Sequence, residues 1–375
     1  MNSQQNPHVI FRSFLDEVNN VFIDRRAEIE VIGTALVAEE NCVLVGPPGT
    51  AKSLLAETFA KAMKDKYFEY LISRYTTPDE LLGHFSLKQL KDNDMDVRKF
   101  ENKLPDCTVA FLDEVFKASS ALLNSLLTIL NERKVDLGNG VRIKTPLSMV
   151  IGASNEYPFN EESLGALWDR WLFRRHVSLL KKPKDIIRLM TDQHIGKTNA
   201  VLCKDTLLFL REKRDKVSLD LIHEELEELI DFLRNKEIVV SDRRWRKVTK
   251  VVQARAIMDG RSVAKPKDLK ILSEVLWNKP EQRDDIVGFL TTLCSGDVLA
   301  VMALHDAAKE MLENTDVSTM TTLQSGQASR NMKRILSEAK EYSANNDPEI
   351  DEYIDRIDDY TCDLLRKISN ALDGS

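Results

Sequence analysis

A glycine- and proline-rich segment follows the first apolar run of the chain, Cys42–Val45, directly. The segment consists of Gly46, Pro47, Pro48, Gly49, Thr50, Ala51, Lys52 and Ser53. A loop of consecutive backbone N–H groups at the start of a helix supplies aligned donors and a favourable dipole for a phosphate chain. Lys52 would then reach the β and γ phosphates of a nucleotide, and the Ser53 hydroxyl would bind Mg²⁺.

One position departs from the phosphate-loop pattern GxxxxGK[ST], since Ala51 stands where the pattern has glycine. The added methyl group narrows the backbone freedom of the loop but leaves every N–H in place. The predicted strand before the loop and the predicted helix after it are the context that the motif requires. The alternative interpretation is a chance turn rich in glycine and proline.

A second apolar run, Val109–Leu112, ends in the carboxylates Asp113 and Glu114. Open α/β sheets bind their ligands at the carboxyl ends of their strands. Asp113 is therefore expected to hold the metal ion, directly or through water, and Glu114 to polarise the attacking water. An ordinary surface Asp-Glu pair is the alternative, but together with the phosphate loop upstream the pair predicts nucleotide hydrolysis.

A third apolar run, 147–151, leads into Gly152–Asn155. The side-chain amide of Asn155 could orient the water and touch the γ-phosphate from a neighbouring strand end. Taken alone, an asparagine there is more often a turn residue. Beside Lys52 and Glu114, the catalytic role is preferred.

The elements that must position these residues alternate between short apolar runs and helical patterns, which predicts an α/β fold with a parallel sheet flanked by helices. Most of the runs are apolar throughout, as expected of strands covered on both faces. The predicted strands are 42–45, 67–72, 109–112, 147–151 and 171–179, and the predicted helices between them are 53–63 and 121–131. Beyond Pro183 the pattern becomes helical, with further helices predicted near 221–233, 241–260 and 265–278.

The C-terminal region carries the net charge of the chain. Lys and Arg number 53 and Asp and Glu 60, a net charge of −7, and residues 341–375 alone account for it with ten acidic and three basic side chains. A neutral remainder lacks the broad basic surface of nucleic-acid-binding proteins. The same region has an apolar stripe at helical spacing, expected to pack on the chain's own helices rather than on a partner. The stripe contains Ile350, Ile354, Ile357, Leu364, Leu365, Ile368 and Leu372.

The five cysteines are scattered, with no CxxC and no Cys/His cluster at metal-ligand spacing. This usage predicts a reducing compartment. The first residues show no basic segment followed by an apolar core, and no stretch approaches the roughly 18 apolar residues of a membrane span. The expectation is a cytoplasmic protein without a membrane span.

With these motifs in place, the chain resembles the AAA+ ATPases, within them the MoxR family, and most closely its RavA-like subgroup. The resemblance covers roughly residues 20–280, and alanine at position 51 is common in that family. The matching stretches are GPPGTAKS (46–53), FEYLISRYTTPDELLG (68–83), FLDEVFKASSALLNSLLTILNERK (111–134), GASNE (152–156), ALWDRW (166–171) and VSDRRWRK (240–247). RavA-like proteins continue into a β-rich domain, whereas this sequence ends in predicted helices, which is a departure from the subgroup.

The resemblance implies roles that spacing alone could not assign. Asn155 matches the polar residue called sensor 1, and Arg170 matches the arginine finger that reaches the γ-phosphate of a neighbouring subunit. Arg174 and Arg175 are rival fingers. Arg244 is similar to the lid arginine called sensor 2, and the adjacent Arg243 is its alternative.

The resemblance also implies an architecture and an activity. The expected parts are a P-loop AAA+ core (1–190) with hairpin insertions near 83–105 and 134–146, an all-α lid (191–280) and a C-terminal helical region (281–375). The activity implied is a Mg²⁺- and ATP-dependent, ring-forming ATPase, a hexamer that remodels protein clients with a von Willebrand factor A domain partner, and ATP would lie between core and lid. Alternatives are a nucleic-acid motor, made less attractive by the neutral charge, and a nucleotide switch without turnover.

Overall fold

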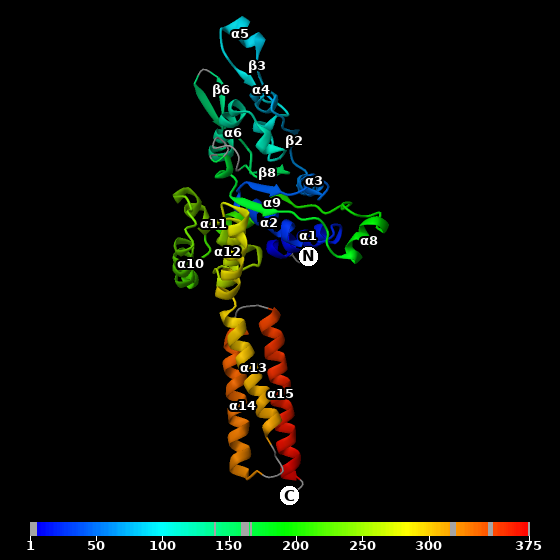
Figure 1. Ribbon diagram of the computed structural model, residues 1–375, viewed down its shortest axis with the longest axis vertical. Helices are drawn as coiled ribbons and strands as arrows, with labels where there is room; N and C mark the ends of the chain where they lie inside the picture. Colours follow the sequence, from blue (N-terminus) through cyan, green and yellow to red (C-terminus); the bar gives the residue numbers. More distant parts are fainter. Residues whose placement is uncertain are drawn as a thin grey trace, which may run out of the picture. The chain divides into compact units, whose positions relative to one another are not determined.

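The structure, a computed structural model, describes residues 6–138, 140–158, 165, 167–315, 320–343 and 348–373 (Figure 1). Asn139 of the predicted hairpin turn, Ala166 of the motif at 166–171 and Asp347 of the acidic tail lie outside these residues. The chain divides into two compact units, which are described separately. The first consists of Met1–Ala264 and Ile271–Ile286, and the second of Lys265–Lys270 and Val287–Ser375.

A five-stranded parallel sheet forms the centre of the first unit, with the strand order β2-β5-β8-β1-β9. Its strands are β1 (Cys42–Val45), β2 (Tyr67–Leu71), β5 (Val109–Asp113), β8 (Met149–Ser154) and β9 (Phe173–His176). Strands β1 and β8 are buried along their whole length, which explains why their sequences are continuously apolar instead of alternating. The α/β fold class and the five predicted strands are confirmed.

Strands β2 and β5 differ from the predicted bounds by one residue, and two other strands differ by more. The strand expected at 147–151 continues to Ser154, because Ser154 pairs with Val45 at the end of β1. The strand expected at 171–179 is limited to β9, and the Trp171 side chain packs under β8 instead. Gly152 makes this packing possible, since a Cβ there would lie 2.8 Å from the Trp171 ring.

Two helices that were not predicted precede the first strand. These are α1 (Pro7–Asn20) and α2 (Arg26–Ala38), and α2 packs on the sheet and is buried almost throughout. The two helices approach closely at Gly33, where a Cβ would lie 2.9 Å from Leu15. Helix α3 (Lys52–Ala62) packs on β5 and β8, and α6 (Ser120–Glu132) follows β5 in the chain. Helices α9 (Lys204–Arg214), which was not predicted, and α11 (Asp242–Met258) pack on α2.

Two insertions leave the core between the strands. The first contains α4 (Pro78–Leu82), β3 (His84–Phe85), α5 (Leu87–Asn93) and β4 (Arg98–Lys99), and the second is the hairpin β6 (Lys134–Gly138) and β7 (Val141–Lys144). The polar residues 91–93 form the end of α5, and Asp94 follows the helix in a left-handed conformation. The insertions meet at Gly138, where φ is +115° and a Cβ would lie 1.6 Å from the carbonyl oxygen of Asp96.

The remainder of the first unit after β9 is helical. It contains α8 (Pro183–Thr191), η3 (Asp220–Ile222), α10 (His223–Asn235) and parts of η4 (Pro266–Glu274) and α12 (Pro280–Leu293). The segment expected as an α-helix from 265 contains the 3₁₀ helix η4 instead. Ser241 caps α11, since its hydroxyl accepts a hydrogen bond from the Arg244 backbone N–H at 3.3 Å.

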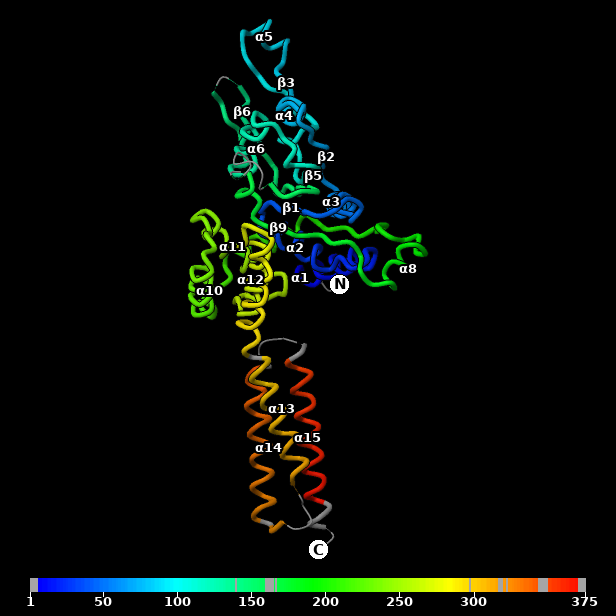
Figure 2. Tube along the Cα trace, viewed as in Figure 1, coloured from blue at the N-terminus to red at the C-terminus, as the bar shows by residue number. Residues whose placement is uncertain are grey.

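The second unit contains a bundle of three long helices, which lie side by side in Figure 2. They are α13 (Gly296–Asn314), α14 (Thr322–Ser343) and α15 (Pro348–Asp373). The apolar stripe of α15 lines the core of this bundle with Ile350, Ile354, Ile357, Leu364 and Ile368. The stripe therefore packs on the chain's own helices, as predicted. Among the described residues no single helix has the length and apolarity of a membrane span, although α12 and residues 298–314 together form a bent pair that does.

Candidate active site

The carboxyl ends of β1, β5 and β8 bring together the side chains that were predicted from three separate motifs. Lys52 Nζ lies 3.2 Å from Asn155 Oδ1, and Asn155 Nδ2 donates to Glu114 Oε1 at 2.6 Å. Asn155 therefore bridges the lysine and the carboxylate. The sheet order explains the contact, because β8 lies between β1 and β5.

The phosphate loop has the backbone geometry that its sequence predicts. Gly46 follows β1 and lies close to the end of the neighbouring strand β9. A Cβ on Gly46 would lie 2.1 Å from the carbonyl oxygen of Val177, which directly follows β9. Gly49 has φ +78° and Ala51 has φ +66°, so the alanine adopts a left-handed conformation that glycine adopts without cost. The alanine at position 51 therefore introduces local backbone strain, and the loop keeps the left-handed conformation at this position.

Lys52 is buried, with 7% of its surface exposed, at the first turn of α3. Its Nζ donates to the carbonyl oxygens of Gly46 at 2.7 Å and Pro47 at 2.9 Å. Burial lowers the pKa of Lys52, and the nearby charges of Asp113 and Glu114 partly oppose that shift. The ammonium group is thus held by its own loop, on the side of the loop that faces the two carboxylates.

The two carboxylates at the end of β5 are oriented by a backbone reversal. Glu114 has φ +54°, a left-handed conformation rare for glutamate, and its N–H donates to Asp113 Oδ1 at 2.9 Å. Lys117 Nζ lies 3.3 Å from Glu114 Oε1. Asp113 and the exposed hydroxyl of Ser53 supply oxygen ligands, the donor type that Mg²⁺ prefers, so these residues fit that ion.

An arginine that the sequence analysis did not single out holds the phosphate loop in place. Arg25 Nε donates to the Thr50 carbonyl oxygen at 3.2 Å, and its Nη2 donates to the Ser178 carbonyl oxygen at 2.9 Å. Its guanidinium therefore ties the loop to the segment after β9. No motif marks this residue, because it precedes Thr50 by 25 positions and acts through tertiary contacts.

An apolar cavity of about 300 Å³ adjoins the loop on the side of Arg25. Its walls are Phe22, Ile23, Arg25, Gly49, Thr50, Ala51, Leu179, Leu180, Ile186, Leu189 and Ile195. A mostly apolar cavity with a few backbone polar groups suits a flat aromatic base. The loop and the cavity together match the two halves of a nucleotide, a charged phosphate chain and an apolar base.

The arginines predicted to act on phosphate lie at the other edge of the sheet. Asn41, which precedes β1, donates from Nδ2 to the Arg170 carbonyl oxygen at 3.4 Å. Five residue steps of strand, about 16 Å, separate Asn41 from Gly46. Figure 1 shows α3 and α11 at opposite ends of the strands. The backbone of Arg170 therefore lies at the amino edge of the sheet, whereas Lys52 lies at the carboxyl edge.

Asp169 gathers the arginines at this amino edge. Its Oδ1 accepts hydrogen bonds from Ser241 Oγ at 3.0 Å and Arg244 Nη2 at 3.1 Å, and its Oδ2 lies 3.6 Å from Arg243 Nη1. Burial lowers the pKa of Arg170, and the neighbouring positive charge of Arg243 lowers it further. Arg244, the candidate for sensor 2, contacts Asp169 and Asn278 at this edge.

Two family models match successive parts of the chain. The model of the MoxR domain in the MoxR-vWA-beta-propeller ternary systems matches residues 10–212, and a model of the AAA lid domain matches residues 218–290. The chain belongs to the MoxR family of AAA+ ATPases. The α/β core with a helical lid is the architecture of that family, and nucleotide and Mg²⁺ are what AAA+ ATPases use in general.

Individual proteins similar to this MoxR-family chain come from archaea and bacteria. Two uncharacterized proteins of Methanocaldococcus jannaschii are 39% and 40% identical, over 71% and 72% of this chain and 71% and 70% of their own lengths. The chaperone MoxR1 of Mycobacterium tuberculosis is 25% identical over 45% of this chain and 44% of its own. The crystal structure of a proposed ATPase from Cytophaga hutchinsonii shares the fold, with 21% identity and a TM-score of 0.59 over 76% of this chain and 94% of that one.

The two rival finger arginines of this MoxR-family chain are structural. Arg174 is fully buried in β9, donates to the carbonyl oxygens of Trp171 and Trp168 at 3.0 Å each, and lies 4.5 Å from the Trp168 ring centroid. Arg175 forms ion pairs with Glu28 at 3.0 Å and Glu274 at 2.8 Å. Both side chains are committed to the interior of the first unit.

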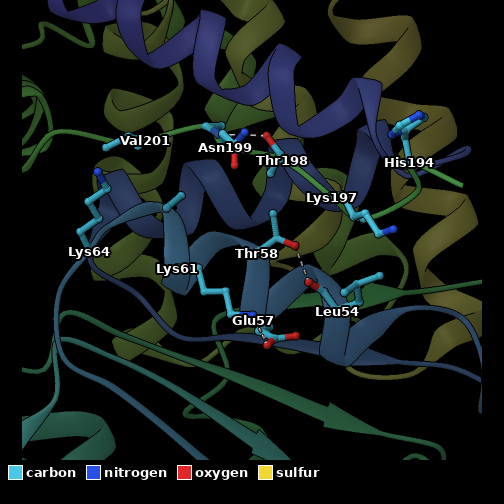
Figure 3. A pocket seen from close by; sticks show the side chains of 13 residues that line it. Leu54, Glu57, Thr58, Lys61, Lys64, His194, Lys197, Thr198, Asn199 and Val201 are labelled. Carbon is cyan, nitrogen blue, oxygen red and sulfur yellow. Dashed lines mark hydrogen bonds and ion pairs between the residues drawn. The ribbon is translucent and has the colours of Figure 1, made fainter.

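A wider cavity of about 710 Å³ lies between α3 and residues 194–201 (Figure 3). Lysines dominate its charged lining, and Figure 3 shows Lys61 beside Glu57, with which it forms an ion pair. None of the phosphate-loop residues 46–53 and none of the carboxylates at the end of β5 line it. The cavity is therefore not part of the candidate nucleotide site, although it is larger than the cavity beside Arg25.

Proposed function

We propose that this MoxR-family chain hydrolyses ATP with Mg²⁺ at a site shared between subunits of a head-to-tail ring, a hexamer. The observation that carries the proposal is the separation of the predicted residues. Lys52, Glu114 and Asn155 meet at the carboxyl edge of the sheet, whereas Arg170 starts from the amino edge. A phosphate bound at one edge is best reached by the arginines of another copy.

In this mechanism the loop 46–53 binds the phosphates through its backbone N–H groups, and Lys52 exchanges the loop carbonyls for phosphate oxygens. Asn155 already bonds to Glu114, so it can hold the carboxylate and the attacking water in line with the γ-phosphate. Glu114 accepts the proton of that water. Mg²⁺, held by Ser53 and Asp113, would neutralise the charge on the phosphate oxygens.

The neighbouring subunit would contribute Arg170, with Arg244 or Arg243 as a second cation. An arginine suits this task because its charge persists at all physiological pH values and its planar fork matches phosphate oxygens. The ion pairs to Asp169 hold Arg243 and Arg244 ready at the same edge. The lid would thus act on the nucleotide of the adjacent copy and not on that of its own chain.

We further propose a chaperone-like role on protein clients, together with a von Willebrand factor A domain partner. The matched MoxR model describes systems that contain such a partner, and a similar protein is named a chaperone. The assignment to the RavA-like subgroup rests on the sequence motifs alone. We place the protein in the cytoplasm, because its five cysteines are free thiols, as in reducing compartments.

The test is steady-state ATP hydrolysis over a series of protein concentrations, with light scattering after size-exclusion chromatography at each concentration. We expect specific activity to rise as a ring-sized species forms. Lys52→Ala should abolish tight ATP binding, and mixing it with Arg170→Ala subunits should restore part of the activity lost in either variant. Hydrolysis by a monomer at all concentrations would contradict the shared site, and binding without turnover would favour a nucleotide switch.

A further inference from the structure

The helix α8 carries apolar side chains that are exposed on the surface of the chain. None of its nine residues, all of which the structure describes, is buried. Ile187 is 60% exposed and Met190 78% exposed, and Leu179 just before the helix is also exposed. Exposed apolar side chains gathered on one short helix mark an interaction surface more often than isolated ones do.

The lid carries an apolar groove of about 680 Å³ between α10 and the start of α11. Its lining contains Ile230, Leu233, Arg234, Glu237, Ile238, Val239, Val240, Asp242 and Trp245. Val239 is 78% exposed, and Trp245 is half-buried. We call this feature the lid groove. Its lining combines apolar side chains with the charged Arg234, Glu237 and Asp242, a combination that suits an amphipathic helix.

These two surfaces lie beside the two halves of the proposed nucleotide site. Helix α8 adjoins the phosphate loop, since Ile186 and Leu189 line the same cavity as Gly49 and Thr50. The lid groove adjoins the arginines, since Asp242 on its rim precedes Arg243 directly. Figure 1 shows α8 and α10 at opposite sides of the first unit.

We propose that α8 of one copy docks into the lid groove of the next copy. The inference rests on the proposed shared site: a subunit whose arginines reach its neighbour's phosphates brings its lid groove toward that neighbour's α8. Because the two surfaces differ, the contact is heterologous and propagates head to tail, as a ring requires. The exposed Lys182 and Lys184 at the start of α8 complement the carboxylates of Glu237 and Asp242 on the groove rim.

Docking would also connect assembly to nucleotide binding. Ile186 and Leu189 of α8 line the apolar cavity, and Ile187 and Met190 beside them are the more exposed side chains of the helix. A lid groove that covers Ile187 and Met190 would hold α8, and with it this wall of the cavity, in place. The base is then bound more tightly by an assembled subunit than by a separate one.

The test uses one substitution on each surface, Ile187→Asp on α8 and Val239→Asp in the lid groove, in the full chain. Each variant alone should remain monomeric at concentrations at least tenfold above those at which the wild type assembles. A mixture should form a dimer with twice the subunit mass, because each variant keeps one intact surface. The control is Leu208→Asp on α9, which is 49% exposed, lies on neither surface and should assemble like the wild type.

Charge reversal guards against variants that fail to fold. Lys184→Glu should weaken assembly, and combining it with Glu237→Lys should restore it at least in part. If both aspartate variants assemble like the wild type while hydrolysis still rises with concentration, the docking proposal is wrong and the shared site stands. A wild-type protein that stays monomeric yet hydrolyses ATP fully would overturn both.

Discussion

The two edges of the central sheet differ in the charged side chains that they bring together. At the carboxyl edge, the neutral amide of Asn155 accepts a hydrogen bond from the Lys52 ammonium group and donates one to the Glu114 carboxylate. At the amino edge, Asp169 lies among three arginines, and burial lowers the pKa of Arg170 and of Arg244. The first edge joins a lysine, an amide and a carboxylate within one chain, whereas the second gathers arginines around the single carboxylate of Asp169. In the proposed ring, the arginines of the second edge would serve the nucleotide of an adjacent copy.

The largest predicted effect comes from removing the charge of Arg170 at the amino edge. Arg170→Ala should lower turnover by about 1,000-fold, the loss typical of an arginine finger. Nucleotide binding by dilute subunits should stay unchanged, because the loop 46–53 is intact. Turnover and equilibrium binding measured on the same preparation separate the two effects. Equal losses in both would mean that Arg170 serves the nucleotide of its own chain.

At the carboxyl edge, Glu114→Gln should lower turnover by about 100-fold or more while binding persists. The amide keeps the shape of the side chain and can still contact Asn155 but cannot accept a proton from water. Single-turnover hydrolysis with ATP bound in excess of its dissociation constant measures the chemical step. Full turnover in this variant would exclude Glu114 as the base.

Within the amino-edge region, Arg174→Met separates structure from catalysis. The substitution leaves the carbonyl oxygens of Trp168 and Trp171 without their buried donor, so the free energy of unfolding should fall by about 3 kcal/mol. Urea denaturation measures the change. The matched control is Arg243→Met, which is 41% exposed and should change stability by less than about 0.5 kcal/mol.

A smaller effect is expected in the phosphate loop itself. Ala51→Gly should raise the free energy of unfolding by about 1 kcal/mol, because φ at this position is +66°. Gly49→Ala should lower it by a similar amount, since φ there is +78° and the added Cβ meets open space. Denaturant unfolding of both variants tests the pair, and effects of the same sign would contradict the strain at Ala51.

The smallest predicted effect is a pH dependence from Lys52. Burial lowers its pKa in the folded chain, so between that value and the ordinary 10.5 the unfolded chain binds more protons. The cost of burying the charge is present in full below the folded pKa and disappears as the pH rises. Stability of the wild type relative to Lys52→Met should therefore increase toward pH 10.5. An unchanged difference across this range would contradict the buried ammonium.

Much of the carboxyl edge could be predicted from sequence because its chemistry is local. A phosphate loop needs its glycines, lysine and hydroxyl in adjacent positions, and parallel strands bring Asp113, Glu114 and Asn155 to the same edge. The same reasoning located the strands to within a few residues. It missed α1 and α2, whose apolar residues have no motif to announce them, and it missed Arg25, which acts through backbone carbonyls of distant segments.

Sequence alone determined the family, the α/β class with its helical lid, and the residue types around the phosphate. Only the tertiary structure decided which partners Arg174 and Arg175 have. Arg170, Arg174 and Arg175 stand within six positions of one another, yet Arg174 is sealed under tryptophans and Arg175 is bound to two glutamates. The physical reason is that burial and ion pairing depend on residues as distant as Glu274, which neighbouring letters in a sequence do not record.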